Sequence, residues 1–271
     1  MTNKKRFNKI VSDIKKIKIQ GASSIARAAL YAYSLEKTQQ AKKKLIQARP
    51  TEPMLANTLH NYEKIGYKKT MEHFQDSQEK INRLVLKIIK NNSVIFTHCH
   101  STAVVNALVY AKKKGRKFEV YNTETRPLYQ GRKTARELAK SGIKTTQFID
   151  SAIDIALEKK QQTKQVDVIL LGADAILKTG VINKVGSGMI AELAFLHKIP
   201  FYIVADSWKY SSKYYPIEER DFHEAWNHVP RNIKIRNPAF ERVPKRYIKA
   251  IISELGILRY NKFLEKVKKN N

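Results

Sequence analysis

The chain has little of three things: cysteine, acidic residues and uninterrupted apolar sequence. Its 271 residues include one cysteine, Cys99, which excludes an internal disulfide framework and any metal site built from several cysteines. No apolar run approaches the roughly 18–20 residues that a membrane-spanning helix needs. The basic N-terminus also lacks the continuous apolar segment of a signal peptide. We therefore expect a cytoplasmic protein with no membrane partner.

Basic residues outnumber acidic ones by 52 to 24, which gives a net charge of +28. Such a charge suggests a nucleic-acid partner. The lysines are dispersed, however, and the short runs at 42–44, 112–114 and 266–269 have no interleaved aromatic residues that could stack on bases. A basic surface attracts an anionic small molecule equally well. Nucleic acid is therefore the least favoured partner.

The spacing of apolar residues changes near residue 90. Before it, helical spacing predicts a helix at 7–17, a second over 25–48 that Ser23 or Ser24 could cap, and two more near 54–65 and 70–90. After it, short β-rich segments alternate with helical patterns, which predicts a parallel sheet covered on both faces. The expected fold class is α/β, with a helical N-terminal domain (1–90) followed by a Rossmann-like parallel-sheet catalytic domain (91–271).

The second domain is predicted in more detail from its β-rich segments. The strands are expected at 93–98, 117–122, 145–150, 166–171 and 200–206. The stretch 172–185 is predicted to be a long loop, and a helix is expected near 244–255. No G-x-G-x-x-G motif follows the first strand, so we expect no dinucleotide cofactor.

Cys99 lies where the first predicted strand meets the helix that starts near Ser101. In an open parallel sheet this edge faces the ligand crevice, and a helix N-terminus there favours a thiolate. The alternative is an inert buried thiol. His98 and His100 flank Cys99, but on an extended backbone they point away from it, which leaves at most two ligands on either face. We expect no metal site.

A second group of polar residues follows the strand at 166–171. Gly172 opens a turn that holds Asp174, and Asn183 and Lys184 follow. Gly186 and Gly188 precede the next helix, whose N-terminus could bind a phosphate. The alternative for Asp174 alone is that it caps a turn.

Two further segments carry groups that could bind an anion. In TETRPLYQGRKTAREL (123–138), polar residues including Gln130 crowd the end of a strand, either to recognise phosphate or to form a salt-bridged turn. In the N-terminal half, small residues open a helix at 20–24 with Arg27 one turn further on, and Arg49 stands at a proline-stiffened turn.

Taken together and in order, these segments resemble one family. It comprises the methylthioribose-1-phosphate isomerases, the archaeal ribose-1,5-bisphosphate isomerases and the regulatory (alpha, beta, delta) subunits of eukaryotic initiation factor 2B. The resemblance covers roughly residues 18–260. The matching segments are QGA (20–22), RPT (49–51), THCHS (97–101), TETRPLYQG (123–131), GAD (172–174), INKVGSG (182–188) and RNPAFERVP (236–244).

The resemblance implies an aldose–ketose isomerase, because the enzymes of this family have the cysteine and aspartate that the regulatory subunits generally lack or replace. His-Ser after the cysteine, the simple QGA motif and the tail resemble the ribose-1,5-bisphosphate branch, although Ser187 stands where threonine is usual. That branch would make ribulose 1,5-bisphosphate in nucleotide (AMP) salvage. The implied catalytic pair is a Cys99 thiolate that shuttles a proton and an Asp174 acid. The implied substrate-binding residues are Gly21, Ala22, Arg27, Arg49, Gln130, Asn183 and Lys184.

The resemblance also implies partners and leaves alternatives open. We expect a sugar bisphosphate as substrate, no cofactor, and a homo-oligomer, either dimer or hexamer. A nucleotide activator is a further candidate partner that the sequence does not specify. The alternatives are a methylthioribose-1-phosphate isomerase and a non-catalytic initiation factor 2B-like regulatory subunit.

Overall fold

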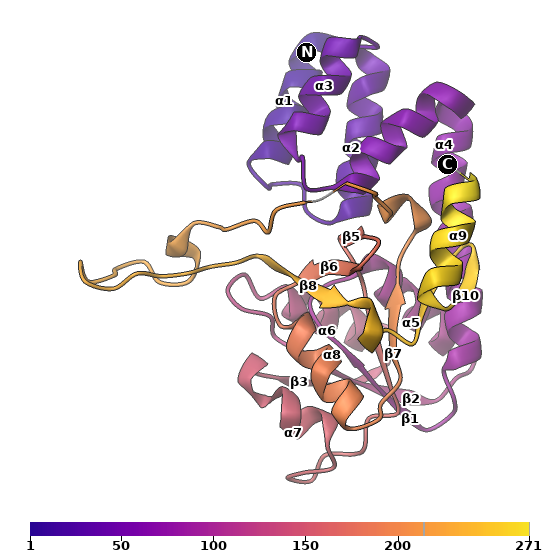
Figure 1. Cartoon of the computed structure of the whole chain (residues 1–271), viewed down its shortest axis with the longest axis vertical. Helices are drawn as coiled ribbons and strands as arrows, with labels where there is room; N and C mark the ends of the chain where they lie inside the picture. The colour runs from indigo at the N-terminus through magenta and orange to yellow at the C-terminus, as the bar shows by residue number, and fades with distance from the viewer. Residues whose placement is uncertain (214, 271) are drawn as a thin grey trace.

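The first helices of the chain form a separate bundle above the sheet (Figure 1). The computed structural model describes residues 1–213 and 215–270. Its first three helices are α1 (Asn3–Lys15), α2 (Ala22–Leu35) and α3 (Gln39–Ala48). Their apolar stripes meet in one cluster that includes Phe7, Ile14 and Leu45, so the predicted helical N-terminal region is confirmed.

The predicted helix over 25–48 is wrong in its continuity. The chain leaves the helix after Leu35 and re-enters it at Gln39, where the hydroxyl of Thr38 accepts a hydrogen bond from the Ala41 N–H at 3.1 Å. The start of α2 also differs from the expectation. Gly21 occupies the N-cap position with φ 85°, and neither serine caps the helix with its side chain. Thr38 was the overlooked signal, since threonine is a preferred N-cap residue.

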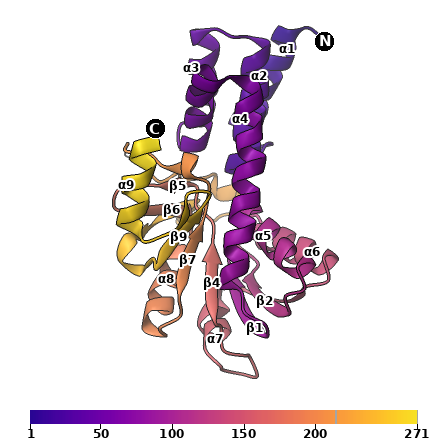
Figure 2. The same ribbon diagram turned by 90° about the vertical axis from the view of Figure 1, so that its right-hand side faces the viewer.

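A single long helix, α4 (Pro53–Ile88), connects the bundle to the sheet (Figure 2). It kinks at Gly66, whose φ of 78° is readily available only to glycine, so the two helices predicted here are two arms of one element. Leu55 and Leu59 on the first arm pack in the bundle, whereas Ile81 and Val85 on the second pack against the sheet. The domain division at residue 90 stays a prediction, because α4 contributes to both parts.

The main sheet has seven strands in the order β10-β9-β7-β4-β1-β2-β3, and only β10 runs antiparallel to its neighbour. The predicted strands are confirmed to within a few residues, and the mixed α/β fold with a mostly parallel sheet is as expected. The strands are β1 (Ser93–Thr97), β2 (Phe118–Thr123), β3 (Lys144–Phe148), β4 (Val168–Leu171), β7 (Phe201–Val204), β9 (Ala250–Ser253) and β10 (Gly256–Leu258).

Helices cover both faces of the sheet, as burial of near-continuous apolar strands requires. One face packs against α7 (Ile153–Leu157), α8 (Ser187–Leu196) and α9 (Tyr260–Asn270), and the other against the end of α4, α5 (Thr102–Lys113) and α6 (Gln130–Lys140). Among the described residues, we find no helix that combines the length and the apolar character needed to cross a membrane.

A small second sheet replaces the loop predicted at 172–185. It consists of β5 (Ala175–Ile176), β6 (Gly180–Lys184) and β8 (Phe240–Pro244), in the order β5-β6-β8 and antiparallel throughout. The helix expected near 244–255 is also wrong. Residues 250–253 form a strand buried on both faces between β7 and β10, and a short apolar run of this kind has no periodicity that separates strand from helix.

The strand order places a crevice beside β1. This strand pairs with β2 on one side and with β4 on the other, so the chain reverses its direction of winding between β1 and β4. Ligands of open α/β sheets bind at this point, outside the carboxyl ends of the strands. Cys99 follows β1 and Asp174 follows β4, which brings both to the same crevice.

Candidate active site

One cavity of about 380 Å³ lies between the N-terminal bundle and the carboxyl edge of the sheet. Its volume falls within the range of small-molecule sites. Residues from both halves of the chain line it. The lining includes all nine residues singled out from the sequence: Gly21, Ala22, Arg27, Arg49, Cys99, Gln130, Asp174, Asn183 and Lys184.

The backbone of Cys99 is fixed by two threonines that the sequence analysis did not select. The Cys99 N–H donates to Thr125 Oγ1 at 3.0 Å, and Thr134 Oγ1 donates to the Cys99 carbonyl at 2.8 Å. These bonds hold Cys99 at a φ of 63°, a left-handed conformation that is uncommon for a residue with a side chain. The thiol therefore has a defined position on the cavity wall, just before α5.

The expected resting thiolate of Cys99 is not supported. Burial raises the pKa of the Cys99 thiol to about 11, even though the positive charge of Lys184 acts in the opposite direction. At neutral pH the ligand-free thiol is protonated. The cost of removing a charge from water outweighs the favourable start of α5.

The two histidines beside Cys99 are engaged away from it. The His98 ring lies between Thr123 Oγ1 at 2.5 Å and the Val185 carbonyl at 2.9 Å, and burial lowers its pKa to about 4, so it is neutral. His100 Nδ1 lies 3.0 Å from Thr134 Oγ1. Both rings position the backbone around the thiol.

Asp174 lies in the turn after β4 with its carboxyl facing the cavity. Gly172 is required at the start of the turn, because a Cβ there would come within 2.6 Å of Ser101 Oγ. Burial raises the pKa of Asp174 despite the lowering effect of Lys209 and Lys184. Within residues 1–213 and 215–270, the Asp174 carboxyl accepts no hydrogen bond, so it does not serve as a turn cap.

Asn183 and Lys184 enter the cavity from β6. Both are buried, and Ser187 fixes them, since its hydroxyl accepts from Asn183 Nδ2 at 2.8 Å and donates to the Lys184 carbonyl at 2.6 Å. The hydroxyl of Ser187 thus makes both hydrogen bonds that position Asn183 and Lys184. The ammonium of Lys184 lies close enough to Cys99 and Asp174 to lower the pKa of each.

The phosphate site predicted at the start of α8 is occupied by a residue of the protein. Glu241 from β8 accepts hydrogen bonds from the N–H groups of Gly186 and Gly188, at 2.5 and 2.9 Å. A carboxylate neutralises a helix N-terminus much as a phosphate would. The start of α2 differs, because Gly21 caps it without a side chain and the first residues of this helix line the cavity.

Arg27 and Arg49 take different positions around the cavity. Arg27 lies on the rim with its guanidinium 4.7 Å from the centre of the Phe74 ring. Arg49 pairs with Glu218, with Nη1 to Oε1 at 3.0 Å.

In the segment 123–138 one residue forms a salt bridge and another lines the cavity, and phosphate recognition by this segment stays a prediction. Arg132 forms a salt bridge with Glu124 at 2.7 Å, whereas Gln130 lines the cavity.

Three polar atoms of the cavity wall are buried and have no hydrogen-bond partner in the part of the chain that the structure describes. They are Arg49 Nε, Glu52 Oε2 and Gln130 Oε1. Buried polar groups normally have a partner, so three orphaned atoms on one cavity indicate a polar ligand. Glu52 was not predicted from the sequence, because nothing local indicates that its carboxyl lies on a cavity wall.

Two groups of described side chains have the composition of a metal site. Asp154, Glu158 and His197 form partly exposed ion pairs. The second group is His73, Asp206 and Glu254.

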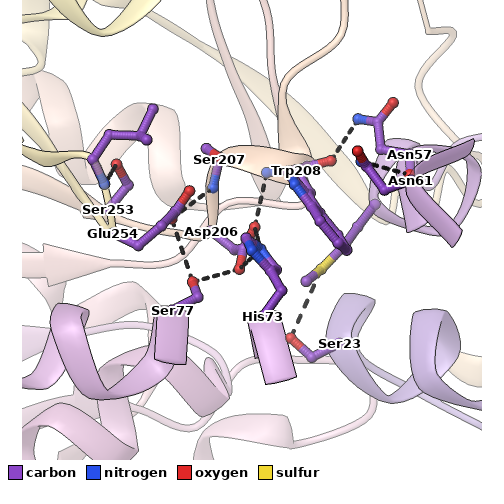
Figure 3. Close-up of polar contacts among 12 residues, drawn as sticks. Ser23, Asn57, Asn61, His73, Ser77, Asp206, Ser207, Trp208, Ser253 and Glu254 are labelled. Carbon is purple, nitrogen blue, oxygen red and sulfur yellow. Dashed lines mark hydrogen bonds and ion pairs between the residues drawn. The ribbon is translucent and has the colours of Figure 1, made fainter. Parts of the chain in front are cut away.

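The group around Asp206 is saturated with hydrogen bonds (Figure 3). Asp206 accepts from Ser77 Oγ at 2.5 Å and the Trp208 N–H at 2.8 Å, and lies 3.1 Å from His73 Nε2. Burial alone would lower the pKa of His73, but the hydrogen bond to Asp206 and the charge of Asp206 raise it. His73 also stacks on Trp208 with ring centres 3.6 Å apart. This group joins α4 to the end of β7.

Comparison with known sequences gives a consistent result. A model described as the Initiation factor 2 subunit family matches residues 16–260. The chain is 33% identical to the ribose 1,5-bisphosphate isomerase of Thermococcus kodakarensis, with 94% of this chain and 91% of that protein covered. It is 30% identical to the methylthioribose-1-phosphate isomerase of Thermosipho melanesiensis, with 98% and 90% covered.

Solved structures of other proteins have the same fold. The translation initiation factor eIF-2B of Pyrococcus horikoshii matches with a TM-score of 0.82 and 26% identity, covering 94% of this chain and 97% of that one. The 5-methylthioribose 1-phosphate isomerase of the same organism matches with a TM-score of 0.78, covering 98% and 88%, and its 23% identity supports the fold alone. One fold thus carries a named translation factor and a named enzyme, and the site has to distinguish them.

Proposed function

This chain belongs to the Initiation factor 2 subunit family, and from that premise we propose that it is a sugar-phosphate isomerase that converts ribose 1,5-bisphosphate into ribulose 1,5-bisphosphate. The observation that carries the proposal is the convergence of Cys99 and Asp174, 75 positions apart in the sequence, on one cavity with anion-binding groups. The relatives named as ribose 1,5-bisphosphate isomerases support the choice of reaction.

The first step requires an acid. A ribose with a phosphate on its C1 oxygen cannot open its ring spontaneously, because that oxygen has no proton to release. Asp174 donates a proton to the ring oxygen as the bond from that oxygen to C1 breaks. The raised pKa of Asp174 suits this role, since the group must hold its proton at neutral pH.

The second step requires a base near C2. The Cys99 thiolate removes the hydrogen on C2, which leaves a double bond between C1 and C2. Cys99 then returns this hydrogen to C1 as the C2 hydroxyl gives up its proton, and the ketone forms. Because the pKa of Cys99 is raised to about 11, the thiolate is a minority species at neutral pH, and turnover should rise with pH until Asp174 loses its proton.

The cavity is suited to an anion with more than one phosphate. The open N–H groups at the start of α2, together with Arg27 and Arg49, would hold one phosphate. Arg49 would exchange its Glu218 partner for the ligand. Additional basic side chains line the same space and would favour a bisphosphate over a monophosphate: Lys133, Lys184, Lys209 and Arg220.

Substrate turnover tests the proposal directly. The purified protein is mixed with ribose 1,5-bisphosphate and, separately, with 5-methylthioribose 1-phosphate, and ketose formation is followed by carbon NMR. We expect turnover of the bisphosphate and its loss in Cys99→Ser, with circular dichroism and the melting temperature retained. Near-normal activity of Cys99→Ser would overturn the mechanism.

The same assay separates the alternatives. Preference for the methylthio sugar would make the chain a methylthioribose-1-phosphate isomerase. Failure with both sugars, combined with co-purification of a translation factor, would favour the regulatory-subunit function. The cytoplasmic location and the place of the reaction in AMP salvage are part of the proposal, and a metabolite comparison in cells lacking the protein tests them.

We also propose that the chain forms a homo-oligomer. The outer side of α8 exposes Phe195 and Leu196, each 69% accessible, and the segment between β7 and β8 exposes Phe222 and Trp226 as it extends away from the body (Figure 1). Apolar surface of this kind commonly marks an interface. Light scattering after size-exclusion chromatography distinguishes monomer, dimer and hexamer, and the same run with added nucleotide tests for an activator that changes the assembly.

A further inference from the structure

Glu52 is a buried acid for which the proposed reaction has so far no role. It occupies the N-cap position of α4 and is 5% exposed. Its side chain makes no capping hydrogen bond to the helix. Its carboxyl lies on the cavity wall instead, with Oε2 buried and unpartnered.

The surroundings of Glu52 link it to Asp174. Burial is the main reason that the pKa of Glu52 is raised, to about 8, and the negative charge of Asp174 is the next. Two carboxyls in one enclosed site resist the loss of both protons, so the pair retains one proton through neutral pH. Four other charged side chains act on the pair: Arg49 after α3, Lys184 on β6, Lys209 after β7, and Glu218 between β7 and β8. Glu218 is itself paired with Arg49 and Arg220.

The reaction needs two opposite proton transfers to oxygen. The ring oxygen must gain a proton, and the hydroxyl on C2 must lose one. A single carboxyl would have to perform both tasks on different atoms of the sugar. A pair that shares one proton holds an acid and a base at the same time.

We propose that Glu52 and Asp174 act as a carboxyl pair that carries one proton between them, with Glu52 as the second acid–base residue of the isomerisation. In the reactive form the one proton of the pair is on Asp174, which gives it to the ring oxygen, and the Glu52 carboxylate accepts the proton of the C2 hydroxyl as the ketone forms. After product release Glu52 gives up this proton and Asp174 takes one up through water, so the pair is restored, while Cys99 carries the carbon-bound hydrogen. This inference rests on the proposed function for its chemistry, but the shared proton is a property of the ligand-free protein.

The first experiment therefore uses no substrate. Protein labelled with carbon-13 at the carboxyls of Asp and Glu is titrated by NMR as wild type, Glu52→Gln and Asp174→Asn. We expect one late titration step near pH 8 in the wild type, absent from both variants, each of which keeps a single carboxyl that titrates at lower pH. Glu63→Gln is the matched control, because it makes the same change on the same helix beside Tyr33, outside the cavity.

The second experiment measures the reaction. In Glu52→Gln we expect kcat/KM at pH 7 to fall by about 10²–10³-fold, the range of a lost acid–base group, with the alkaline limb of its pH profile moved at least one pH unit downward. Glu52→Asp, which keeps a carboxyl, should restore the position of that limb.

The two experiments separate the possible failures. A late step that persists in Glu52→Gln overturns the carboxyl pair, whether or not the protein is an isomerase. Loss of the step together with unchanged kcat/KM and an unchanged profile overturns the catalytic role of Glu52. Absence of turnover in the wild type, with the late step present, overturns the proposed function and leaves the shared proton standing.

Discussion

Asp174 and Asp206 are the same residue type, each follows a strand of the main sheet, and the two strands, β4 and β7, are neighbours. Asp206 is surrounded by donors from His73, Ser77 and the Trp208 backbone, and these contacts lower its pKa in spite of burial. Asp174 has no donor within the described part of the chain, and burial raises its pKa.

The difference shows how the fold distributes structural and chemical roles. A buried carboxyl that is fully hydrogen-bonded is committed to its charged form and to one geometry. A partly buried carboxyl left without donors has a raised pKa and is suited to act as an acid. Loss of the fully hydrogen-bonded carboxyl should therefore lower the free energy of unfolding, and loss of the carboxyl without donors should lower turnover.

The largest expected effect is on turnover through Asp174. Asp174→Asn removes the acid and preserves the shape of the side chain. We expect kcat to fall by about 10²–10⁴-fold, as for loss of a general acid. The free energy of unfolding should be unchanged or higher, because a poorly solvated carboxyl is removed. The check is ketose formation alongside urea denaturation, and a variant with more than a tenth of normal turnover would contradict the assignment.

The counterpart is Asp206→Asn. This change breaks the contact with His73 inside the protein and should lower the free energy of unfolding by about 3 kcal/mol. The loss should depend on pH. Because the pKa of Asp206 is lowered on folding, its stabilisation is lost as the solution becomes more acidic than the unfolded value of about 3.9. Because the pKa of His73 is raised, its stabilisation is present below about 6.5 and disappears as pH rises through the folded value. Urea denaturation of wild type and variant at pH 5 and pH 9 should show the larger difference at pH 5.

A smaller effect with the opposite sign is expected at Glu52. Its pKa is raised on folding, to about 8, so the folded state binds this proton more tightly and loses stability as pH rises from about 4.5 to 8. Glu52→Gln should therefore raise the free energy of unfolding at pH 9 by about 1–2 kcal/mol, typical of a functional group held at the expense of stability. If the variant has an equal or lower free energy of unfolding than the wild type at pH 9, Glu52 stabilises the fold, as Asp206 does.

The smallest expected effect is that of Ser77→Ala. It removes one hydrogen bond to Asp206 while His73 and the Trp208 N–H remain. We expect a loss of about 1 kcal/mol in the free energy of unfolding. Addition of Ser77→Ala to Asp206→Asn should then cost less than the sum of the two single changes, which a double-mutant cycle measures.

The sequence carried enough information for the sheet domain and for much of the site lining. Strand–helix alternation predicts the strands, and the ends of parallel strands bring Cys99 and Asp174 to one edge. The same reasoning failed for the second small sheet, since residues 175–176 and 180–184 are short and their partner, β8, lies some 60 positions later. Long-range pairing of this kind leaves no local pattern.

Charge states were harder to predict than positions. The helix start beside Cys99 favours a thiolate, but the depth of burial that reverses this is visible only in three dimensions. Glu241 at the start of α8 could not be anticipated either, because it reaches Gly186 from a strand 55 residues further on. Glu52 was passed over for a related reason, since nothing local indicates that its carboxyl turns into a cavity.

The pairing of β6 with β8 has a consequence for synthesis of the protein. Residues 180–184 carry Asn183 and Lys184, yet their outer neighbour is the segment 240–244, some 60 positions later in the sequence. The segment 240–244 must therefore leave the ribosome before this side of the site can close, although the N-terminal bundle can form early. Translation products that end before residue 240 would therefore lack the strand that completes this side of the site.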